Sequence, residues 1–488
     1  MCAMELSREQ LEWAFAHRRD DVSALALGKL PWDGEARTLL LRQVSARQML
    51  EKKVPDWSAC PWLEFPASLP LEQCSSQRTA LYKLALVKKL FPDGKEVCEG
   101  LPVSCVFPDG KASPESDFAV AKTTVGADLT GGLGIDAWFL SSHFETYHYV
   151  ERQEELCRLA GNNFSELNKT LLQGSASERN AVDCRRNIEV HQSEADEWLS
   201  SMERVNFLYL DPSRRDEKGR KVAALADCSP DVARQLPALL AKTDVLMLKL
   251  SPMLDVSLAL SSLPGTRQVH VVAVDNDCKE LLFVLAGPGK APDSSELSGL
   301  PRATMAGSSG LSGSSFGETP DSSGLSGSEP EFFAVNLRKD GRDQLLRFYP
   351  SDEANAVCPL ADSSALLPGR YLLEPNVAVL KAGAFKLPAL AFGLEKLHAN
   401  THLYLSDGPV PEFPGKCLRI EQVLPPSAKS TKQCLRALER AEVVCRNYPE
   451  TVDSIRRKYG LAGGGDRYVY ALTAGDGRRW LLVCQLSS

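Results

Sequence analysis

A glycine-rich turn between two short apolar runs carries the clearest chemical signal in this sequence. The turn contains three glycines, Gly131, Gly132 and Gly134, and it follows an apolar run at 125–129. The next apolar run ends in an acid, Glu151. Glycines let a backbone approach a ligand closely, and an acid roughly 20 residues further on can accept hydrogen bonds from both hydroxyls of a ribose. This spacing predicts a nucleotide-binding strand, turn and helix, and the alternative is a plain turn followed by a solvated glutamate.

Further acids stand where other apolar runs end. Asp128 lies at the end of the first run, and Glu194 follows the third run, with Asp196 as the alternative to Glu194. Open parallel sheets bind their ligands at the carboxyl ends of the strands, so these acids are expected at one edge. For Glu194 the alternative is a solvated acid in the first turn of a helix, a common placement.

The fourth apolar run, 205–210, leads into a second chemically marked segment. That segment consists of Asp211, Pro212, Ser213 and Arg214. A guanidinium can grip a phosphate or a carboxylate; the alternative for Arg214 is a structural pair with Asp216 or Glu217. Lys249 lies at the end of the fifth apolar run, so we expect it near the same edge. A salt bridge beside the core is the alternative role for Lys249.

The elements that must position these residues alternate between strands and helices. Strands are expected at 125–129, 147–150, 187–190, 205–210, 244–250 and 269–274. Helices are expected between them at 152–163, 194–202 and 230–242. This alternation indicates an α/β fold with a parallel sheet and helices on both of its faces.

The first 95 or so residues have helical periodicity. Ser7 and Gln10 have the spacing of a capping box, and further periodic stretches cover 36–51 and 71–90. Polar side chains within 71–83 recur at three- and four-residue steps, which places them on one helix face. They are Gln73, Ser76, Thr79, Tyr82 and Lys83. We expect a solvated face, and the alternative is the lining of a cofactor or substrate cleft.

Composition excludes several classes of protein. A length of 488 residues predicts two to four domains, and 43% apolar with 24% charged residues is typical of a soluble globular chain. No apolar run is long enough for a membrane span, and the first ten residues do not resemble a signal peptide, so we expect a cytoplasmic protein. The 14 cysteines and seven histidines have no metal-ligand spacing, and no metal site is predicted.

Charge is unevenly distributed along the chain. Residues 368–488 contain 17 Lys or Arg and 11 Asp or Glu, a net charge of +6, which leaves −13 for the rest. A basic module on an acidic body favours polyanion binding confined to one part of the chain. The alternative is a solvated surface that happens to be basic.

Four regions follow from these patterns. They are a helical N-terminal region at 1–95, a Rossmann-like domain at 96–274, a small β-rich segment at 275–365 and an α+β domain at 366–488. Within the third region, 287–330 is a tract rich in Ser and Gly with an imperfect repeat. Such a tract has too few large apolar groups to fold on its own, so we expect a disordered insertion.

Taken together, several ordered motifs resemble a bacterial family of class I S-adenosylmethionine (SAM) methyltransferases with a C-terminal THUMP-like domain. In the first half they occupy 72–83, 128–136, 211–215, 249–255 and 278–280. In the second half they occupy 374–376, 381–385, 398–404, 413–415, 446–449 and 464–466. The resemblance covers roughly residues 20–286 and 331–485. It implies that 275–365 is a ferredoxin-like segment and that 366–488 is the THUMP-like domain.

The resemblance also implies roles for individual residues. The loop from Asp128 through Thr130 to Gly134 would pass the methionyl part of SAM, and Asp128 and Asp136 would orient its ammonium group. Glu151 would bind the ribose hydroxyls. Glu194 would bind the adenine amine. The segment Asp211 to Arg214, together with Lys249, would then orient the methyl acceptor.

The acceptor motif departs from those of well-understood base methyltransferases. Enzymes that methylate base amines have Pro and an aromatic residue where this chain has Ser213 and Arg214. Uridine-C5 methyltransferases need a cysteine nucleophile after the fifth strand, where this chain has Ser251. The leading hypothesis is a SAM-dependent methyltransferase that acts on structured RNA through its basic C-terminal domain. The alternatives are a methyltransferase of a protein or small molecule, and a non-catalytic protein that binds SAM or RNA.

Overall fold

The computed structural model describes residues 6–66, 71, 73–92, 124–174, 185–213, 230–287 and 329–487. Contacts between residues divide the chain into two compact units. The first comprises Met1–Thr266 and Leu281–Leu300, and the second comprises Arg267–Glu280 and Pro301–Ser488. Of the predicted insertion at 287–330, all but the terminal residues lie outside the described part of the chain.

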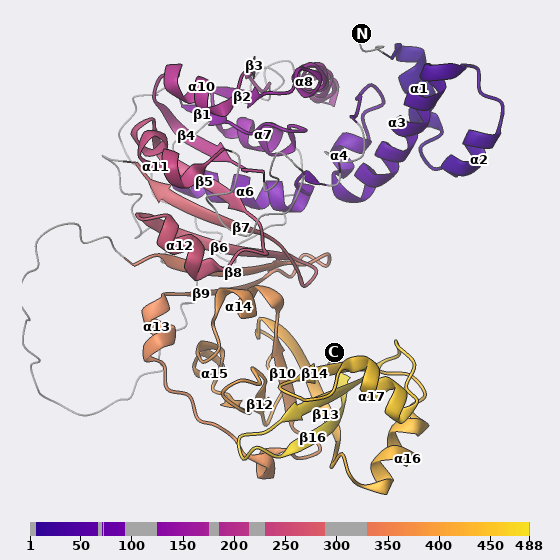
Figure 1. The fold of residues 1–488 in the computed structure, drawn as a ribbon, viewed down its shortest axis with the longest axis vertical. Coiled ribbons are helices and arrows are strands. Elements are labelled where there is room, and N and C mark those ends of the chain that lie inside the picture. Colours follow the sequence, from indigo (N-terminus) through magenta and orange to yellow (C-terminus); the bar gives the residue numbers. More distant parts are fainter. Residues whose placement is uncertain are drawn as a thin grey trace, which may run out of the picture. The chain divides into compact units, whose positions relative to one another are not determined.

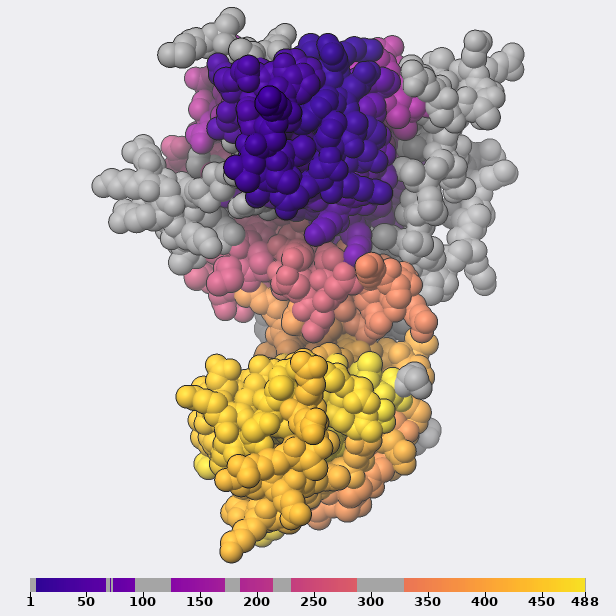
Figure 2. All heavy atoms as spheres, turned by 90° about the vertical axis from the view of Figure 1, so that its right-hand side faces the viewer, coloured from indigo at the N-terminus to yellow at the C-terminus, as the bar shows by residue number. Residues whose placement is uncertain are grey.

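Four helices begin the first unit. They are α1 (Arg8–Ala16), α2 (Val22–Leu27), α3 (Gly34–Lys53) and α4 (Pro55–Ser58). Ser7 caps α1 through the predicted capping box with Gln10. Trp57 is fully buried and its ring packs edge-on against Phe164, so the helical region shares a core with the sheet-bearing part of the unit. In the view of Figure 2 these helices, in indigo, cover the front of the first unit.

A mostly parallel sheet forms the centre of the first unit (Figure 1). Its strands run in the spatial order β3-β2-β1-β4-β5-β7. Their bounds are β1 (Val125–Asp128), β2 (Thr146–Glu151), β3 (Ile188–Gln192), β4 (Val205–Leu210), β5 (Thr243–Leu250) and β7 (Asp277–Ala286). Only β7 is antiparallel to its neighbour here, pairing with β5. The strands predicted at 125–129, 147–150, 187–190, 205–210 and 244–250 are confirmed within two residues at each end.

Helices cover both faces of this sheet, as the alternation predicts. One face carries α6 (Gln77–Leu90), α7 (Ile135–Leu140), the 3₁₀ turn η1 (Ser141–His143) and α8 (Glu154–Gly174). The opposite face carries α10 (Ala195–Ser201) and α11 (Val232–Ala241), and α12 (Val256–Ser262) follows β5 (Figure 1). Side chains of a strand alternate between the faces, so Tyr147 and Tyr149 of β2 enter the core below α8 while His148 faces Trp198 of α10.

The strands expected to form a separate β-rich segment at 275–365 instead continue the large sheet. Its full order is β3-β2-β1-β4-β5-β7-β6-β8-β9, with β6 (Thr266–Val274), β8 (Glu331–Leu337) and β9 (Gln344–Phe348). β6 pairs in parallel with β8, and β8 pairs antiparallel with β9. All seven residues of β8 are buried. A strand that is buried on both faces belongs inside a covered sheet, and the prediction overlooked this pattern.

The second unit also contains a seven-stranded sheet of order β11-β12-β10-β13-β16-β15-β14. Its strands are β10 (Tyr371–Pro375), β11 (Glu395–Lys396), β12 (Tyr404–Ser406), β13 (Gly415–Leu424), β14 (Glu442–Arg446), β15 (Arg467–Thr473) and β16 (Arg479–Leu486). The helices of this part are α13 (Pro350–Asn355), η4 (Ser363–Ala365), α14 (Val377–Ala382), α15 (Leu387–Phe392), α16 (Lys429–Ala437) and α17 (Val452–Tyr459). No helix in the described residues is both long and apolar enough to cross a membrane.

One element of this sheet differs from its expected conformation. The helical periodicity of 431–446 favours one continuous helix, but α16 ends at Ala437 and the segment 442–446 forms strand β14. Val443 and Val444 pair in parallel with Val469 and Tyr470 of β15. β-Branched side chains favour a strand, and this preference outweighs the helical periodicity that precedes them.

Candidate cofactor and acceptor site

The order in which successive strands are added to the sheet reverses between β1 and β4. From β1 the chain proceeds outward to β2 and β3, and it then returns to start β4 and β5 on the other side. Ligands of open α/β sheets bind at such a reversal, outside the carboxyl ends of the strands. Asp128 is the last residue of β1, and Asp211 follows β4 directly. The structure therefore brings together two carboxylates that the sequence predicted at one edge.

Thr130 joins the two strand ends. Its hydroxyl donates to Asp128 Oδ1 over 3.1 Å and accepts the backbone N–H of Asp211 over 2.7 Å. The backbone N–H of Thr130 also donates to Asp128 Oδ1, at 2.9 Å. One short side chain thus sets the spacing between the glycine-rich loop and the segment that begins at Asp211.

The glycines of the loop serve two different purposes. A Cβ at Gly131 would lie 2.3 Å from a ring carbon of Tyr149, and one at Gly134 would lie 2.6 Å from the ring of Phe164. These two glycines are therefore required by aromatic side chains that pack beneath the loop. Gly132 has φ +55° and an added Cβ there would meet nothing closer than the Thr130 carbonyl oxygen, 3.7 Å away. Only at Gly132 does the backbone have open space beside it, as close approach of a ligand requires.

Glu151, the last residue of β2, is held by the backbone. One carboxylate oxygen accepts the N–H of Gly132 over 2.9 Å, and the other accepts the N–H of Gln153 over 2.9 Å. Each carboxylate oxygen can accept a further hydrogen bond, so these contacts orient the group without exhausting it. Tyr149, two residues earlier, donates its hydroxyl to the carbonyl oxygen of Gly132 and ties the loop to the same strand.

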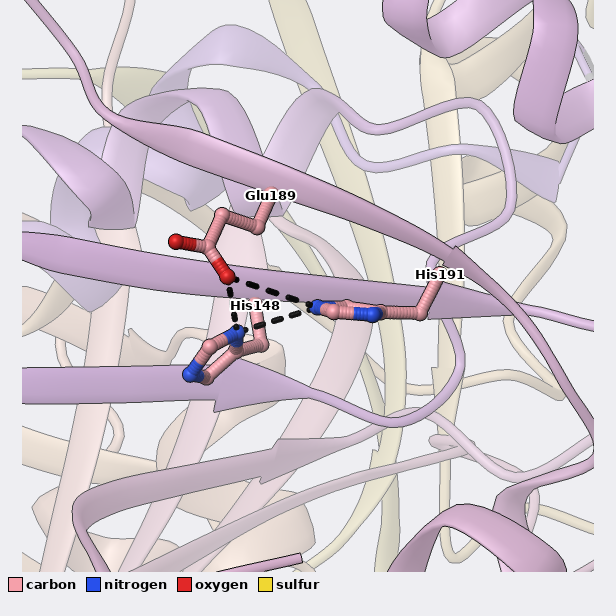
Figure 3. A group of neighbouring side chains, drawn as sticks. All are labelled: His148, Glu189 and His191. Carbon is pink, nitrogen blue, oxygen red and sulfur yellow. Dashed lines mark hydrogen bonds and ion pairs between the residues drawn. The ribbon is translucent and has the colours of Figure 1, made fainter.

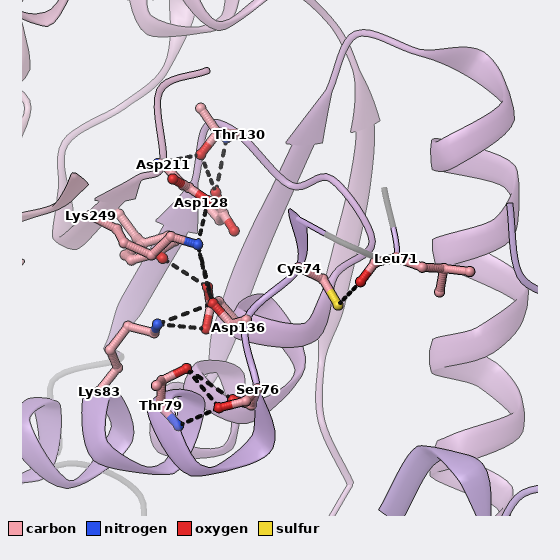
Figure 4. Close-up of polar contacts among 12 residues, drawn as sticks. Leu71, Cys74, Ser76, Thr79, Lys83, Asp128, Thr130, Asp136, Asp211 and Lys249 are labelled. Carbon is pink, nitrogen blue, oxygen red and sulfur yellow. Dashed lines mark hydrogen bonds and ion pairs between the residues drawn. The ribbon is translucent and has the colours of Figure 1, made fainter. Parts of the chain in front are cut away.

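Asp136 lies at the centre of a buried charged cluster (Figure 4). Its carboxylate accepts hydrogen bonds from the hydroxyls of Ser75, at 2.6 Å, and Tyr209, at 2.8 Å. Lys83 Nζ lies 3.1 Å from one oxygen, and Lys249 Nζ lies 4.0 Å from the other. Ser75 also accepts from both ammonium groups, each over 3.2 Å. Each carboxylate oxygen of Asp136 therefore already lies beside a cationic or hydroxyl group of the protein.

The two aspartates of the loop have opposite protonation preferences. Burial raises the pKa of Asp128 to about 8. The hydrogen bonds from Thr130 lower this pKa, and the nearby negative charge of Asp136 raises it. Burial would also raise the pKa of Asp136, but Lys83 and Lys249 together with the hydroxyl hydrogen bonds lower it below its usual value. Near neutral pH, Asp128 is therefore largely protonated and Asp136 is ionised.

The acceptor side centres on an ion pair. Lys249 Nζ lies 2.5 Å from Asp211 Oδ2, and it links this carboxylate to Ser75 and Asp136. The Lys249 side chain is 12% exposed, whereas the Asp211 side chain is 37% exposed. Pro212 is buried and Ser213 is exposed, while Arg214 lies outside the described residues.

The predicted adenine-binding acids lie further along the same edge. Glu194 is the exposed N-cap residue of α10 and makes no side-chain cap hydrogen bond. Asp196, the alternative, accepts from the side-chain amide of Gln235 over 2.6 Å and lies 3.7 Å from Arg234. Because Asp196 contacts α11, Glu194 is the better placed of the two for a ligand.

Three members of the charged cluster were missed or misjudged from the sequence. Ser75 and Tyr209 were not predicted as site residues, and Lys83 was expected on a solvated helix face. In the structure Lys83 is completely buried, and Thr79 and Tyr82 of the same face are buried too. The available signal is that Lys83 lies three residues after Ala80 and four before Val87, on the apolar face of α6.

Comparisons with protein families identify the C-terminal part of the chain. A family model described as a ferredoxin-like domain matches residues 371–414, and one described as THUMP domain-like matches residues 415–486. The first covers β10 to β12 and the second covers β13 to β16. The ferredoxin-like match therefore falls within the region predicted as THUMP-like, 366–488, and not at 275–365. No curated protein matched the chain.

Solved structures extend the likeness to the whole chain. A protein from Porphyromonas gingivalis W83, described as a "putative methyltransferase", aligns over 98% of both chains with 27% identity and a TM-score of 0.72. An rRNA methylase from Streptococcus thermophilus aligns over 34% of this chain and 87% of its own, with 14% identity and a TM-score of 0.24. The full-length likeness, together with the family models, confirms the predicted fold class and the resemblance to methyltransferases with a C-terminal THUMP-like domain.

Proposed function

We propose that this chain, which has a class I methyltransferase fold followed by a THUMP-like domain, transfers a methyl group from SAM to structured RNA. The observation that carries the proposal is the convergence at one sheet edge of the glycine loop, Glu151 and the Asp211–Lys249 pair. Group transfer requires a cofactor site directly beside polar groups that can position the acceptor, and this edge of the sheet has both.

The residues present fit SAM as a cofactor. Glu151 is oriented by two backbone N–H groups at the end of β2, where the ribose hydroxyls would lie. The open space beside Gly132 admits the methionyl part, and exposed Glu194 is available for the adenine amine. Asp128 would accept the ammonium group once that cation displaces its proton. Asp136 is already paired with Lys83, so we assign it to positioning Lys249 in place of direct cofactor contact.

When bound, SAM supplies an electrophilic methyl group. Methyl transfer is an in-line displacement, so positioning supplies most of the rate and the protein need not form a covalent intermediate. In this chain Thr130 fixes the backbone of Asp211, and Lys249 fixes its carboxylate. The carboxylate would accept a hydrogen bond from the N–H or O–H group of the acceptor and so aim the nucleophilic atom. Where base-amine methyltransferases have a stacking aromatic residue, this sequence has Arg214.

The C-terminal unit supplies a basic surface for RNA. Exposed cationic side chains lie on or near α16 and α17: Lys429, Lys432, Arg436, Arg440 and Arg457. Phosphate contacts by such groups release counterions, which makes the affinity fall steeply with salt. The THUMP domain-like match to residues 415–486 includes this surface and supports RNA as the acceptor.

The acceptor class can be tested by incubating the protein with methyl-labelled SAM and either total RNA or a protein extract. We expect label in RNA, and we expect Asp211→Asn to abolish it while leaving SAM binding in place. Asp244→Asn is the matched control, because Asp244 pairs with Arg204 at the opposite end of β5.

Other outcomes of the same experiment separate the alternatives. Label in protein or in small molecules would show that the protein is a methyltransferase whose acceptor is not RNA. SAM binding without label in any fraction would favour a non-catalytic binding protein. Absence of SAM binding in calorimetry with the wild-type chain would overturn every form of the proposal.

A further inference from the structure

A cluster of three metal-ligating side chains lies on the sheet face opposite the core below α8. His148 comes from β2, and Glu189 and His191 come from the adjacent strand β3 (Figure 3). His148 is the register partner of Glu189 in this parallel pair. Residues two apart on a strand share a face, so His191 joins them on the side that faces α10. The two histidines lie 43 positions apart in the chain, which explains why the sequence showed no metal-ligand spacing.

The three ligand atoms have the separations of a coordination sphere. His148 Nδ1 lies 3.0 Å from His191 Nε2 and 3.3 Å from Glu189 Oε2, and His191 Nε2 lies 3.8 Å from the same oxygen. Zinc binds nitrogen and carboxylate oxygen at about 2.0–2.2 Å, which for a tetrahedron places neighbouring ligand atoms about 3.3–3.6 Å apart. Shifts of a few tenths of an ångström would therefore bring all three atoms onto one ion.

The surroundings suit a partly open site. The ring of Trp198 on α10 lies 5.4 Å from the His148 ring and 5.6 Å from the His191 ring, between centroids, and covers one side. The side chains of His148, His191 and Glu189 are 21%, 33% and 50% exposed, so water reaches the other side. Three protein ligands with an accessible remaining position are the usual donor set of an open zinc site.

We propose that His148, Glu189 and His191 form a binding site for one first-row divalent transition metal, with zinc as the representative ion and water completing its coordination. Two imidazoles exclude magnesium and calcium as preferred occupants, since those ions take oxygen ligands. The ion joins β3, the last strand of the sheet on this side, to β2. Its occupancy should therefore stabilise the strand that leads to Glu194, whichever acceptor the protein methylates.

The test uses the full chain after chelator treatment and dialysis. Zinc titration by calorimetry is expected to show one equivalent bound, and Co²⁺ should give the visible absorption of a tetrahedral site with nitrogen and oxygen ligands. His148→Ala, His191→Ala and Glu189→Gln should each weaken binding at least about tenfold, since loss even of an outer-shell partner typically has that effect. Zinc should also raise the thermal unfolding midpoint of the wild type, and Mg²⁺ should not.

Two controls keep the result specific. His17→Ala removes a histidine that stacks on Trp13 in the N-terminal helices, and it should leave zinc binding unchanged. Near-ultraviolet charge-transfer bands with Co²⁺ would instead indicate cysteine ligands. The proposal is overturned if folded His148→Ala/His191→Ala protein binds zinc as well as the wild type, or if the wild type binds no zinc at micromolar concentration.

Discussion

The cofactor half of the candidate site and its acceptor half are held by different kinds of contact. On β1 and β2 the backbone does most of the positioning: Glu151 accepts N–H groups from Gly132 and Gln153, and Gly131 donates to the carbonyl of Val150. On β4, β5 and α6 charged side chains hold one another within the cluster around Asp136. Changes to the buried residues of the cluster around Asp136 should therefore act mainly on folding, and changes at Glu151 should act mainly on ligand binding.

The largest effect is expected from Lys83→Met. Lys83 is completely buried against Asp136. Among the described residues, its removal leaves the more distant Lys249 as the countercharge for this buried carboxylate. Breaking a buried ion pair in this way typically lowers the free energy of unfolding by about 3–5 kcal/mol. Urea unfolding would measure the change.

Two further variants show whether that loss comes from the pair. Lys88→Met removes an exposed lysine from the same helix and should change the free energy of unfolding by less than about 0.5 kcal/mol. The double variant Lys83→Met/Asp136→Asn should recover most of the stability, because no unpaired charge remains. A loss below 1 kcal/mol for Lys83→Met would contradict the contrast between the two halves.

Glu151→Gln is the corresponding test of the cofactor half. It removes a charged acceptor that we assign to the ribose hydroxyls, and hydrogen bonds to charged groups contribute about 1.5–3 kcal/mol. We expect the SAM dissociation constant to rise roughly 10- to 100-fold. Because a glutamine can accept only one of the two backbone N–H groups that Glu151 accepts, the unfolding midpoint should also fall, but by less than for Lys83→Met. Calorimetry and a thermal melt on one sample give both values. Glu155→Gln, at the start of α8, is a control acid that should leave SAM affinity unchanged.

Gly131→Ala sharpens the comparison, because this glycine belongs to the cofactor half but is constrained by packing. The new methyl group would clash with Tyr149, and such overpacking typically destabilises by about 1–3 kcal/mol. Gly161→Ala, inside α8 with its nearest neighbour 3.9 Å from the added Cβ, should instead be neutral or stabilising. If Gly131→Ala weakened SAM binding without any loss of stability, direct cofactor approach would be the reason for this glycine.

A pH dependence that originates at Asp128 gives a further test of how the cofactor half is held. Its pKa rises from 3.8 to about 8 on folding, so between these values the folded chain holds a proton that the unfolded chain has lost. The free energy of unfolding therefore falls as pH rises through this window, by at most about 1.4 kcal/mol per pH unit, and levels off above the folded pKa. The lowered pKa of Asp136 acts only below its ordinary value of 3.8, where stability is lost as pH falls.

Asp128→Asn should remove this contribution, because the amide oxygen can still accept from Thr130 but cannot ionise. Unfolding in urea at pH 5 and pH 7 would show a smaller decrease for the variant than for the wild type. Equal decreases would mean that Asp128 is ionised in the folded protein. Saturating SAM should reduce the difference as well, if its ammonium group pairs with this carboxylate.

Much of the sheet was predictable, whereas most of the charged cluster was not. Apolar runs ending in Asp128, Glu151 and Asp211 identified their strands, because a strand and the polar residue after it are close in sequence. The strands after residue 275 were misassigned, since an apolar run alone does not reveal which sheet it joins. Ser75 lies 61 residues from Asp136 and Tyr209 lies 73 residues from it, so no local pattern marked either as a partner.

By itself the sequence determined the α/β alternation, the glycine loop and the acids at the strand ends, because these depend on short-range periodicity and backbone conformation. Only the tertiary structure decided which charges meet. It buried Lys83 against Asp136, paired Lys249 with Asp211 and placed His148 beside His191. The physical reason is that ion pairs and ligand clusters depend on distance in space, and strand order in the sheet sets that distance between residues far apart in the chain.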